Sequence, residues 1–170
     1  NTDVLVTVSN IIQDVKNNKD EACLKYTREF DHVLLDTMEV TEEELDIQIS
    51  KCDKDFVEAM KLAKKNIEDF HKLQKQNGYL LQKEMGIYLG QRVLPLEAVG
   101  IYVPGGRAQY PSSVLMNALP AKIAGVKNVV MVTPPDSEGT IHPNIAYAAK
   151  LAGVDKIYKI GGAQAIAALA

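Results

Sequence analysis

The stretch VGIYVPGG, residues 99–106, decides the fold that this sequence predicts, because a short apolar run ends there in a proline–glycine turn. Two more apolar runs follow, with helix-like segments between them and after them. The runs are residues 129–132 and 156–160, and the helix-like segments are residues 112–124, 144–152 and 163–170. Alternating strands and helices predict a parallel sheet with right-handed crossovers. The second part of the chain is therefore predicted to be α/β, a Rossmann-like βαβαβ sheet that is incomplete.

The 99 residues up to Val99 differ in composition from the 71 that follow. They contain 13 Lys or Arg and 19 Asp or Glu residues, whereas the later part contains 6 and 3. Apolar residues recur in the first part at helical spacing, for example Val4, Val8, Ile11 and Val15. This pattern predicts solvated amphipathic helices. We expect an N-terminal helical region, residues 1–86, followed in residues 87–170 by a hairpin and the first part of an α/β domain.

Capping residues mark the expected helix boundaries. A polar break at residues 17–20 divides the first helical segment. Thr41 opens the sequence TEEE of a capping box, and Asp53 is placed to cap a helix that runs to about Gln76. The helix over residues 112–124 has two candidate caps, Ser112 and Ser113.

Residues 87–94 change to a period of two. The segments 87–89 and 92–94 flank Gly90-Gln91, which predicts a hairpin with its turn at these two residues.

Charge and cysteine content exclude several classes of protein. The net charge is −3 and the pI is about 5.6, whereas a dedicated nucleic-acid-binding domain is usually basic. Cys23 and Cys52 form no CxxC pair, so we expect neither a disulfide framework nor a zinc finger, and a reducing cytoplasm is the expected compartment. No apolar run approaches the ~18 residues of a membrane span. The first residues lack the basic region of a signal peptide, and residues 163–170 lack a C-cap glycine, so we expect a portion of a longer chain.

The turns after the predicted strands are the candidate sites, because ligands of parallel sheets bind at the carboxyl ends of the strands. Tyr102 precedes a Pro-Gly-Gly turn and either contacts a ligand or is an ordinary strand residue. Gln164 lies in the first turn of a helix that opens with Gly161-Gly162, where it either meets an anionic ligand or caps the backbone. The turn at residues 133–136 is better explained as a rigid surface loop than as a nucleotide edge. The three histidines are too scattered to bind a metal.

Several blocks of this sequence closely resemble histidinol dehydrogenase, in the order of that family. The blocks are residues 99–106, 110–126, 151–154 and 158–170, together with the segment KNIEDFH at residues 65–71. The resemblance implies oxidation of L-histidinol through L-histidinal to L-histidine in a homodimer that requires NAD and zinc. It also implies that Tyr102 and Gln164 contact NAD. The family's zinc ligands and catalytic Glu-His pair lie beyond the matched motifs, so no catalytic or metal-binding residue is assigned here and the chain alone is expected to be inactive.

Two other interpretations remain open at this point. A sulfopropanediol dehydrogenase-like alcohol dehydrogenase shares these motifs, and a non-catalytic nucleotide-binding domain would need no acid–base residues. Members of the family that this sequence resembles are intertwined dimers. We therefore expect one apolar stripe to pack on another subunit or on a part of the protein outside this sequence. The stripe consists of Val4, Val8, Ile11 and Val15.

Overall fold

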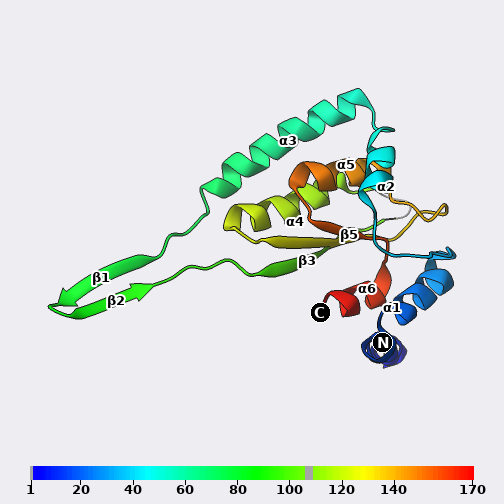
Figure 1. The fold of residues 1–170 in the computed structure, drawn as a ribbon, viewed down its shortest axis with the longest axis horizontal. Helices are drawn as coiled ribbons and strands as arrows, with labels where there is room; N and C mark the ends of the chain where they lie inside the picture. The colour runs from blue at the N-terminus through cyan, green and yellow to red at the C-terminus, as the bar shows by residue number, and fades with distance from the viewer. Residues whose placement is uncertain (1, 106–108) are drawn as a thin grey trace.

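A parallel sheet of three strands lies at the centre of the main body in the computed structural model, which describes residues 2–105 and 109–170 (Figure 1). The strands are β3 (Ala98–Tyr102), β4 (Asn128–Val132) and β5 (Lys156–Tyr158), and β4 is central. Tyr102, Val132 and Tyr158 stand side by side at the carboxyl ends of the strands. The predicted parallel α/β arrangement is confirmed.

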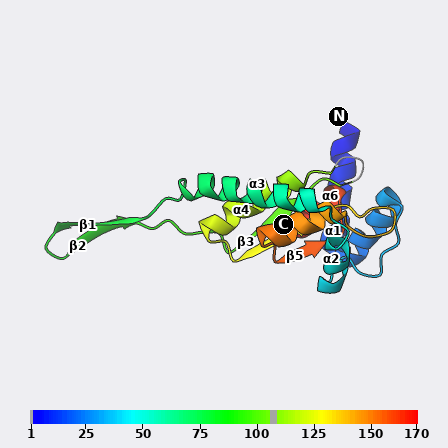
Figure 2. The same ribbon diagram turned by 90° about the horizontal axis from the view of Figure 1, so that it is seen from above.

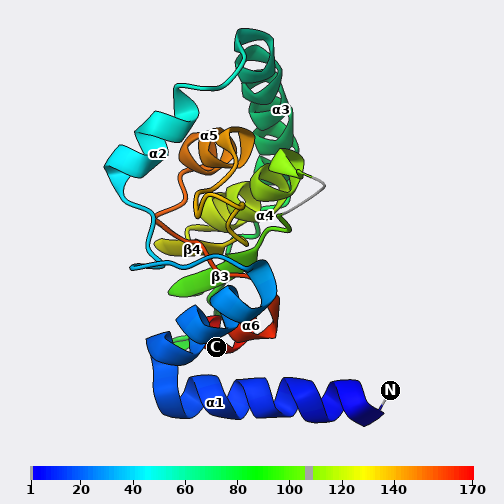
Figure 3. The same ribbon diagram turned by 90° about the vertical axis from the view of Figure 1, so that its right-hand side faces the viewer.

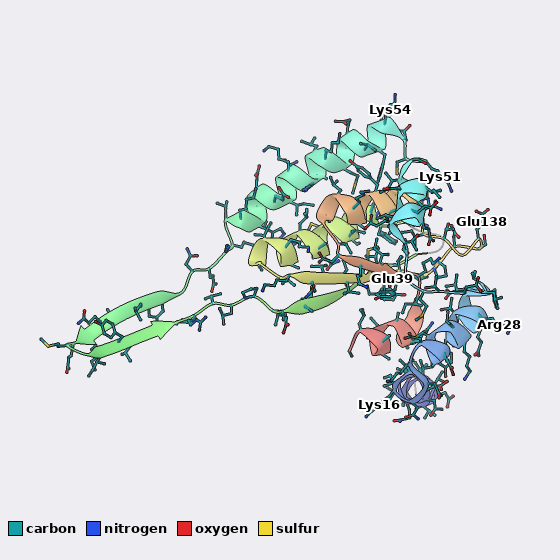
Figure 4. The ribbon with its side chains drawn as sticks, viewed as in Figure 1. Lys16, Arg28, Glu39, Lys51, Lys54 and Glu138 are labelled. Atoms are coloured by element: carbon teal, nitrogen blue, oxygen red, sulfur yellow. The ribbon has the colours of Figure 1, made fainter. Side chains whose placement is uncertain are left out.

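One face of the sheet carries two layers of helices (Figure 3). The inner layer consists of α4 (Pro111–Ala124) and α5 (Pro143–Ala152), which follow β3 and β4 in the chain. The outer layer consists of α2 (Glu42–Ile49) and α3 (Lys54–Lys72), which contact the inner helices. Lys54, at the start of α3, points away from this core (Figure 4). The charged outer face is therefore solvated, as the amphipathic pattern predicts.

The opposite face is covered by α6 (Gly162–Leu169), and α1 (Thr2–Tyr26) packs against α6. A turn of π-helix, Thr27–Asp31, follows α1. The backbone of α1 bends at Lys19, where φ is 49° and ψ is −124°, so the expected break near residues 17–20 is confirmed as a kink. None of the helices in the described part of the chain has the length and apolar character needed to cross a bilayer.

Strand residues alternate between the two faces, as the pleat of a strand requires. Those on the α4–α5 face belong to the larger core, and those on the α6 face belong to a second cluster with α1. The first set includes Ile101, Met131 and Ile157, and the second includes Tyr102, Val132 and Tyr158. Tyr102 thus faces α6, on which Gln164 lies.

The predicted caps of α2 and α3 are confirmed. The Thr41 hydroxyl accepts a hydrogen bond from the Glu44 N–H at 3.1 Å, and the Asp53 carboxylate accepts one from the Asp55 N–H at 2.8 Å. The serine cap predicted for α4 is wrong, because Ser112 and Ser113 lie inside that helix and Pro111 is its first residue. Proline suits the first turn, since its fixed φ is helical and its missing N–H would have had no partner there.

The predicted position of the hairpin turn is also wrong. The hairpin consists of β1 (Tyr79–Glu84) and β2 (Ile87–Gln91), and its turn lies at Met85 and Gly86, where Gly86 has a φ of +83°. Gly90 is inside β2, and a Cβ on it would lie 2.6 Å from the carbonyl oxygen of Tyr79. Close approach across the strands, and not a turn, therefore accounts for Gly90. The hairpin extends well away from the main body (Figure 2).

The apolar stripe of α1 is divided between the interior and the surface. Ile11 and Val15 are buried within this chain, in the cluster that contains α6, whereas Val4 is 64% exposed and Val8 is half-buried. The expectation that all four pack on another subunit or on a part of the protein outside this sequence is therefore wrong for Ile11 and Val15, because α6 already covers them. The division of the chain at residue 86 into two domains stays a prediction.

Candidate functional site

The loops after β3, β4 and β5 lie at one edge of the sheet, because the three strands are parallel. Tyr102 is the last residue of β3, and Gln164 lies in the first turn of α6, four residues after Ile160. The structure brings the elements that carry these two predicted site residues into direct contact.

The contact is a hydrogen bond between Tyr102 and the turn before Gln164. The Tyr102 hydroxyl oxygen accepts a hydrogen bond from the backbone N–H of Gly162 at 3.2 Å. Gly162 has a φ of +64°, a conformation that favours glycine. The N–H groups of a helix's first turn have no partner within the helix, so the phenol occupies a position where an acceptor is needed.

The Gln164 side chain is fully buried, and its polar atoms lack partners among the residues that the structure describes. It is 0% exposed, and neither Oε1 nor Nε2 has a hydrogen-bond partner within residues 2–105 and 109–170. Leaving a buried polar group without a partner costs about 1–3 kcal/mol. A Cβ on Gly162 would lie 2.6 Å from Oε1 of Gln164, so the glycine leaves space for the amide beneath the turn. The amide therefore offers one acceptor atom and two N–H donors for a group that supplies the complementary set.

The neighbouring thiol does not add a nucleophile to this site. Cys23 of α1 is 1% exposed, and its Sγ lies 3.9 Å from the backbone oxygen of Gln164. Burial raises the pKa of the Cys23 thiol above its ordinary value. Cys23 is therefore protonated at neutral pH and packs against the start of α6 as a small apolar group.

The loop after β4 is organised by its own aspartate. Asp136 accepts hydrogen bonds from the N–H groups of Glu138 and Thr140, at 3.0 and 2.9 Å, and from the Thr140 hydroxyl at 2.9 Å. A pocket of about 40 Å³ lies beside this loop and is lined partly by Gly105, Thr133 and His142. Its volume is roughly that of one water molecule, so it does not hold a nucleotide.

Two of the three histidines have local partners that account for them. The Nδ1 atom of His142 accepts a hydrogen bond from the Asn144 N–H at 3.2 Å at the start of α5, and Nδ1 of His71 lies 2.6 Å from Oε1 of Gln74. Within the described residues, no group of three or more His, Cys, Asp or Glu side chains is placed to hold a metal ion. The described part of the protein thus offers no zinc site.

Sequence reasoning did not identify the groups around the two predicted residues. Cys23 lies 141 positions from Gln164, and no local signal in α1 indicates that contact. The positive φ of Gly162 could have been inferred from the paired glycines at a strand–helix turn. The close approach of Pro134 to Gly105 and Gly161 could not have been inferred, because it joins loops that follow three different strands.

Comparison with known proteins places the whole chain in one family. The family model of histidinol dehydrogenase matches residues 1–170. The chain is 56% identical to histidinol dehydrogenase of Clostridium acetobutylicum and 52% identical to that of Streptococcus mutans, in each case over 170 residues, and it spans 39% of the length of each relative.

A solved structure gives the same result. The crystal structure of histidinol dehydrogenase from Elizabethkingia anophelis superposes with a TM-score of 0.92 at 40% sequence identity, over 97% of this chain and 38% of that one. The interpretations as another type of dehydrogenase or as a non-catalytic binding domain find no support in these comparisons. The chain belongs to the histidinol dehydrogenase family.

Proposed function

We propose that this chain forms part of the dinucleotide site of an NAD-dependent, zinc-requiring histidinol dehydrogenase. That enzyme oxidises L-histidinol through L-histidinal to L-histidine, in histidine biosynthesis. Tyr102 and Gln164 are the residues proposed to contact NAD. The acid–base residues are assigned to parts of the enzyme outside this chain, so the chain alone is proposed to be inactive.

The observation that carries the proposal is the buried amide of Gln164, whose two polar atoms lack partners in the described residues. NAD presents hydroxyl, phosphate and carboxamide groups that complement an amide and the first turn of a helix. When bound, NAD supplies the hydride acceptor of the reaction. The share of Tyr102 and Gln164 is to bind and orient the dinucleotide.

Binding must change the turn that covers the amide. Gln164 is 0% exposed, and the Tyr102 hydroxyl already accepts the Gly162 N–H. We therefore propose that the dinucleotide displaces this hydroxyl or shifts the turn at Gly161 and Gly162.

Zinc does not fit the described part of the protein. Its residues contain no cluster of three His, Cys, Asp or Glu side chains that would make a site, and structural or catalytic zinc takes at least three protein ligands. The zinc of the proposed enzyme is therefore assigned to ligands outside this chain, and no step is derived through it.

We also propose that the enzyme is a cytoplasmic homodimer. The feature that supports a dimer is the hairpin, on which every residue from Tyr79 to Gln91 is exposed although several are large and apolar. Exposed apolar surface of this extent is typical of an interaction site. A second copy of the chain is the proposed occupant.

The proposal can be tested with a fused enzyme, in which this chain is joined to the part of the Clostridium acetobutylicum relative that follows the matched region. We expect it to reduce NAD in the presence of L-histidinol and to support growth of a histidine auxotroph that lacks histidinol dehydrogenase. The intact relative is the positive control, and its C-terminal part alone is the negative control. A folded fused enzyme that does not reduce NAD with L-histidinol would refute the proposal.

A further inference from the structure

Pro134 contacts the glycine turns on both sides of it. Because β4 is the central strand, the loop after it lies between the loops after β3 and β5. A Cβ on Gly105 would lie 2.9 Å from the carbonyl oxygen of Pro134 and 3.2 Å from its Cδ. A Cβ on Gly161 would lie 2.5 Å from Cγ of Pro134 and 2.9 Å from its Cβ. Carbon atoms in optimal contact are about 3.5–4.0 Å apart, so neither glycine leaves room for a side chain.

Close approach, and not backbone conformation, explains why these positions are glycine. Gly161 has a φ of −128° and a ψ of −167°, which is extended backbone open to any residue. Gly105 also lacks a positive φ. What the two glycines share is therefore their contact with Pro134.

Each of the two glycines lies three residues from a residue that is proposed to contact NAD. Tyr102 lies three residues before Gly105, and Gln164 lies three residues after Gly161. Gly161 is also the N-cap residue of α6, and the N–H of the next residue is the one that Tyr102 accepts. A shift of Gly161 relative to Pro134 would thus move the start of α6 away from the Tyr102 hydroxyl.

We propose that Pro134 is a positioning residue that sets the separation of Tyr102 and Gln164 for the dinucleotide. It acts through Gly105 and Gly161 and does not itself touch the cofactor. The inference rests on the proposed function, because the distance it sets matters for catalysis only if these two residues bind NAD. A proline suits the task, since its ring is rigid and its φ is fixed.

The first test compares Pro134→Ala with Pro135→Ala in the fused enzyme. Both remove one proline ring from the same loop, but among the described residues the nearest atoms to the two glycines belong to Pro134 and not to Pro135. Because small misplacements of binding groups are costly, we expect Pro134→Ala to raise KM for NAD about tenfold with little change in kcat. We also expect faster hydrogen exchange at the Gly162 amide without NAD. Pro135→Ala should change neither quantity by more than about twofold.

The second test is a double-mutant cycle. It is possible because Gly105 and Gly161 face different atoms of Pro134. Gly161→Ala and Gly105→Ala should each raise KM for NAD and speed exchange at Gly162. Pro134→Gly removes the Cγ and Cβ atoms that a methyl group at position 161 would meet, so in the Pro134→Gly background Gly161→Ala should raise KM for NAD no further. Pro134→Gly keeps the carbonyl oxygen that Gly105 faces, so in that background Gly105→Ala should still raise KM for NAD further.

The outcomes separate this inference from the proposed function. If the unsubstituted fused enzyme neither binds nor reduces NAD, the proposed function fails and this inference fails with it. If that enzyme is active but Pro134→Ala and Pro135→Ala give equal KM values for NAD and equal exchange at Gly162, Pro134 is not a positioning residue. Additive effects throughout the Pro134→Gly and Gly161→Ala cycle would overturn the inference in the same way.

Discussion

The Tyr102 hydroxyl accepts the backbone N–H of Gly162 at 3.2 Å, which joins the end of β3 directly to the first residue of α6. Within the described residues this hydroxyl makes no other hydrogen bond. The Tyr102 hydroxyl therefore binds the N-terminus of α6 in the free protein, and we propose that it binds the dinucleotide in the complex.

Tyr102→Phe tests both uses. The substitution keeps the ring and removes the acceptor, so we expect the free energy of unfolding to fall by about 1 kcal/mol, the usual worth of one hydrogen bond. In the fused enzyme KM for NAD should rise several-fold, and zinc content should not change. Urea denaturation, NAD kinetics and elemental analysis measure the three quantities. An unchanged KM for both Tyr102→Phe and Tyr102→Ala would exclude Tyr102 from the NAD site.

Gln164→Met should separate stability from binding. Methionine has a similar length and no polar atoms that need partners, so we expect the substitution to stabilise the chain by about 1 kcal/mol. The same change should raise KM for NAD several-fold in the fused enzyme, because the amide is the proposed contact. Gln48→Met is the matched control, since Gln48 is also buried but its Oε1 accepts a hydrogen bond from Lys51 at 3.2 Å. Destabilisation by Gln164→Met would mean that the amide contributes to the folded state.

The sheet could be predicted from sequence because its signals are local. Each strand is a short apolar run bounded by glycine, proline or polar residues, and the observed strands differ from the predicted ones by at most two residues at either end. The rule that parallel strands end at one edge then placed Tyr102 and Gln164 near each other. The same local logic failed for the hairpin, because two glycines, Gly86 and Gly90, were available and only their φ and cross-strand distances distinguish them.

The detail of the site could not be predicted because it depends on contacts between distant segments. Pro134 lies against Gly105 and Gly161 only because β4 is the central strand. The sequence of the loop does not indicate the order of the strands. Likewise, Cys23 reaches Gln164 only because α1 folds back on α6. Such contacts follow from the packing of whole elements.

The ion pair between Asp14 and Lys25 makes stability depend on pH in the acid range. Their side chains meet at 2.8 Å across the kink at Lys19, and the hydrogen bonds from Lys25 and Asn18 lower the pKa of Asp14 from 3.8 to about 2. The unfolded state therefore binds more protons between these two values. The contribution of Asp14 to stability is present above pH 3.8 and is lost as the pH falls toward about 2.

Asp14→Asn measures this contribution. The difference in free energy of unfolding between the parent chain and the variant should be constant at neutral pH and should shrink as the pH falls through this window. Lys25→Met should show the same convergence, because it removes the main cause of the lowered pKa. If the difference in free energy of unfolding stays constant down to about pH 2, the pKa of Asp14 is the same in the folded and the unfolded state. Chemical denaturation at a series of pH values provides the data.

The last prediction concerns the exposed hairpin. Leu81 and Leu89 stand opposite each other on β1 and β2 and are 56% and 51% exposed. We expect the double substitution Leu81→Lys and Leu89→Glu to convert the fused enzyme from a dimer to a monomer, because it places two charges in the proposed apolar contact. The opposite charges attract across the strands, so the hairpin itself should be retained.

Lys54→Glu, at the start of α3 and away from the hairpin (Figure 4), is the control for a change of charge. Sedimentation velocity measures the mass of the assembly, and thermal unfolding shows whether the main body is intact. A substituted enzyme that remains dimeric would show that the hairpin does not hold the two copies together, and the proposed role of a second copy would then be wrong.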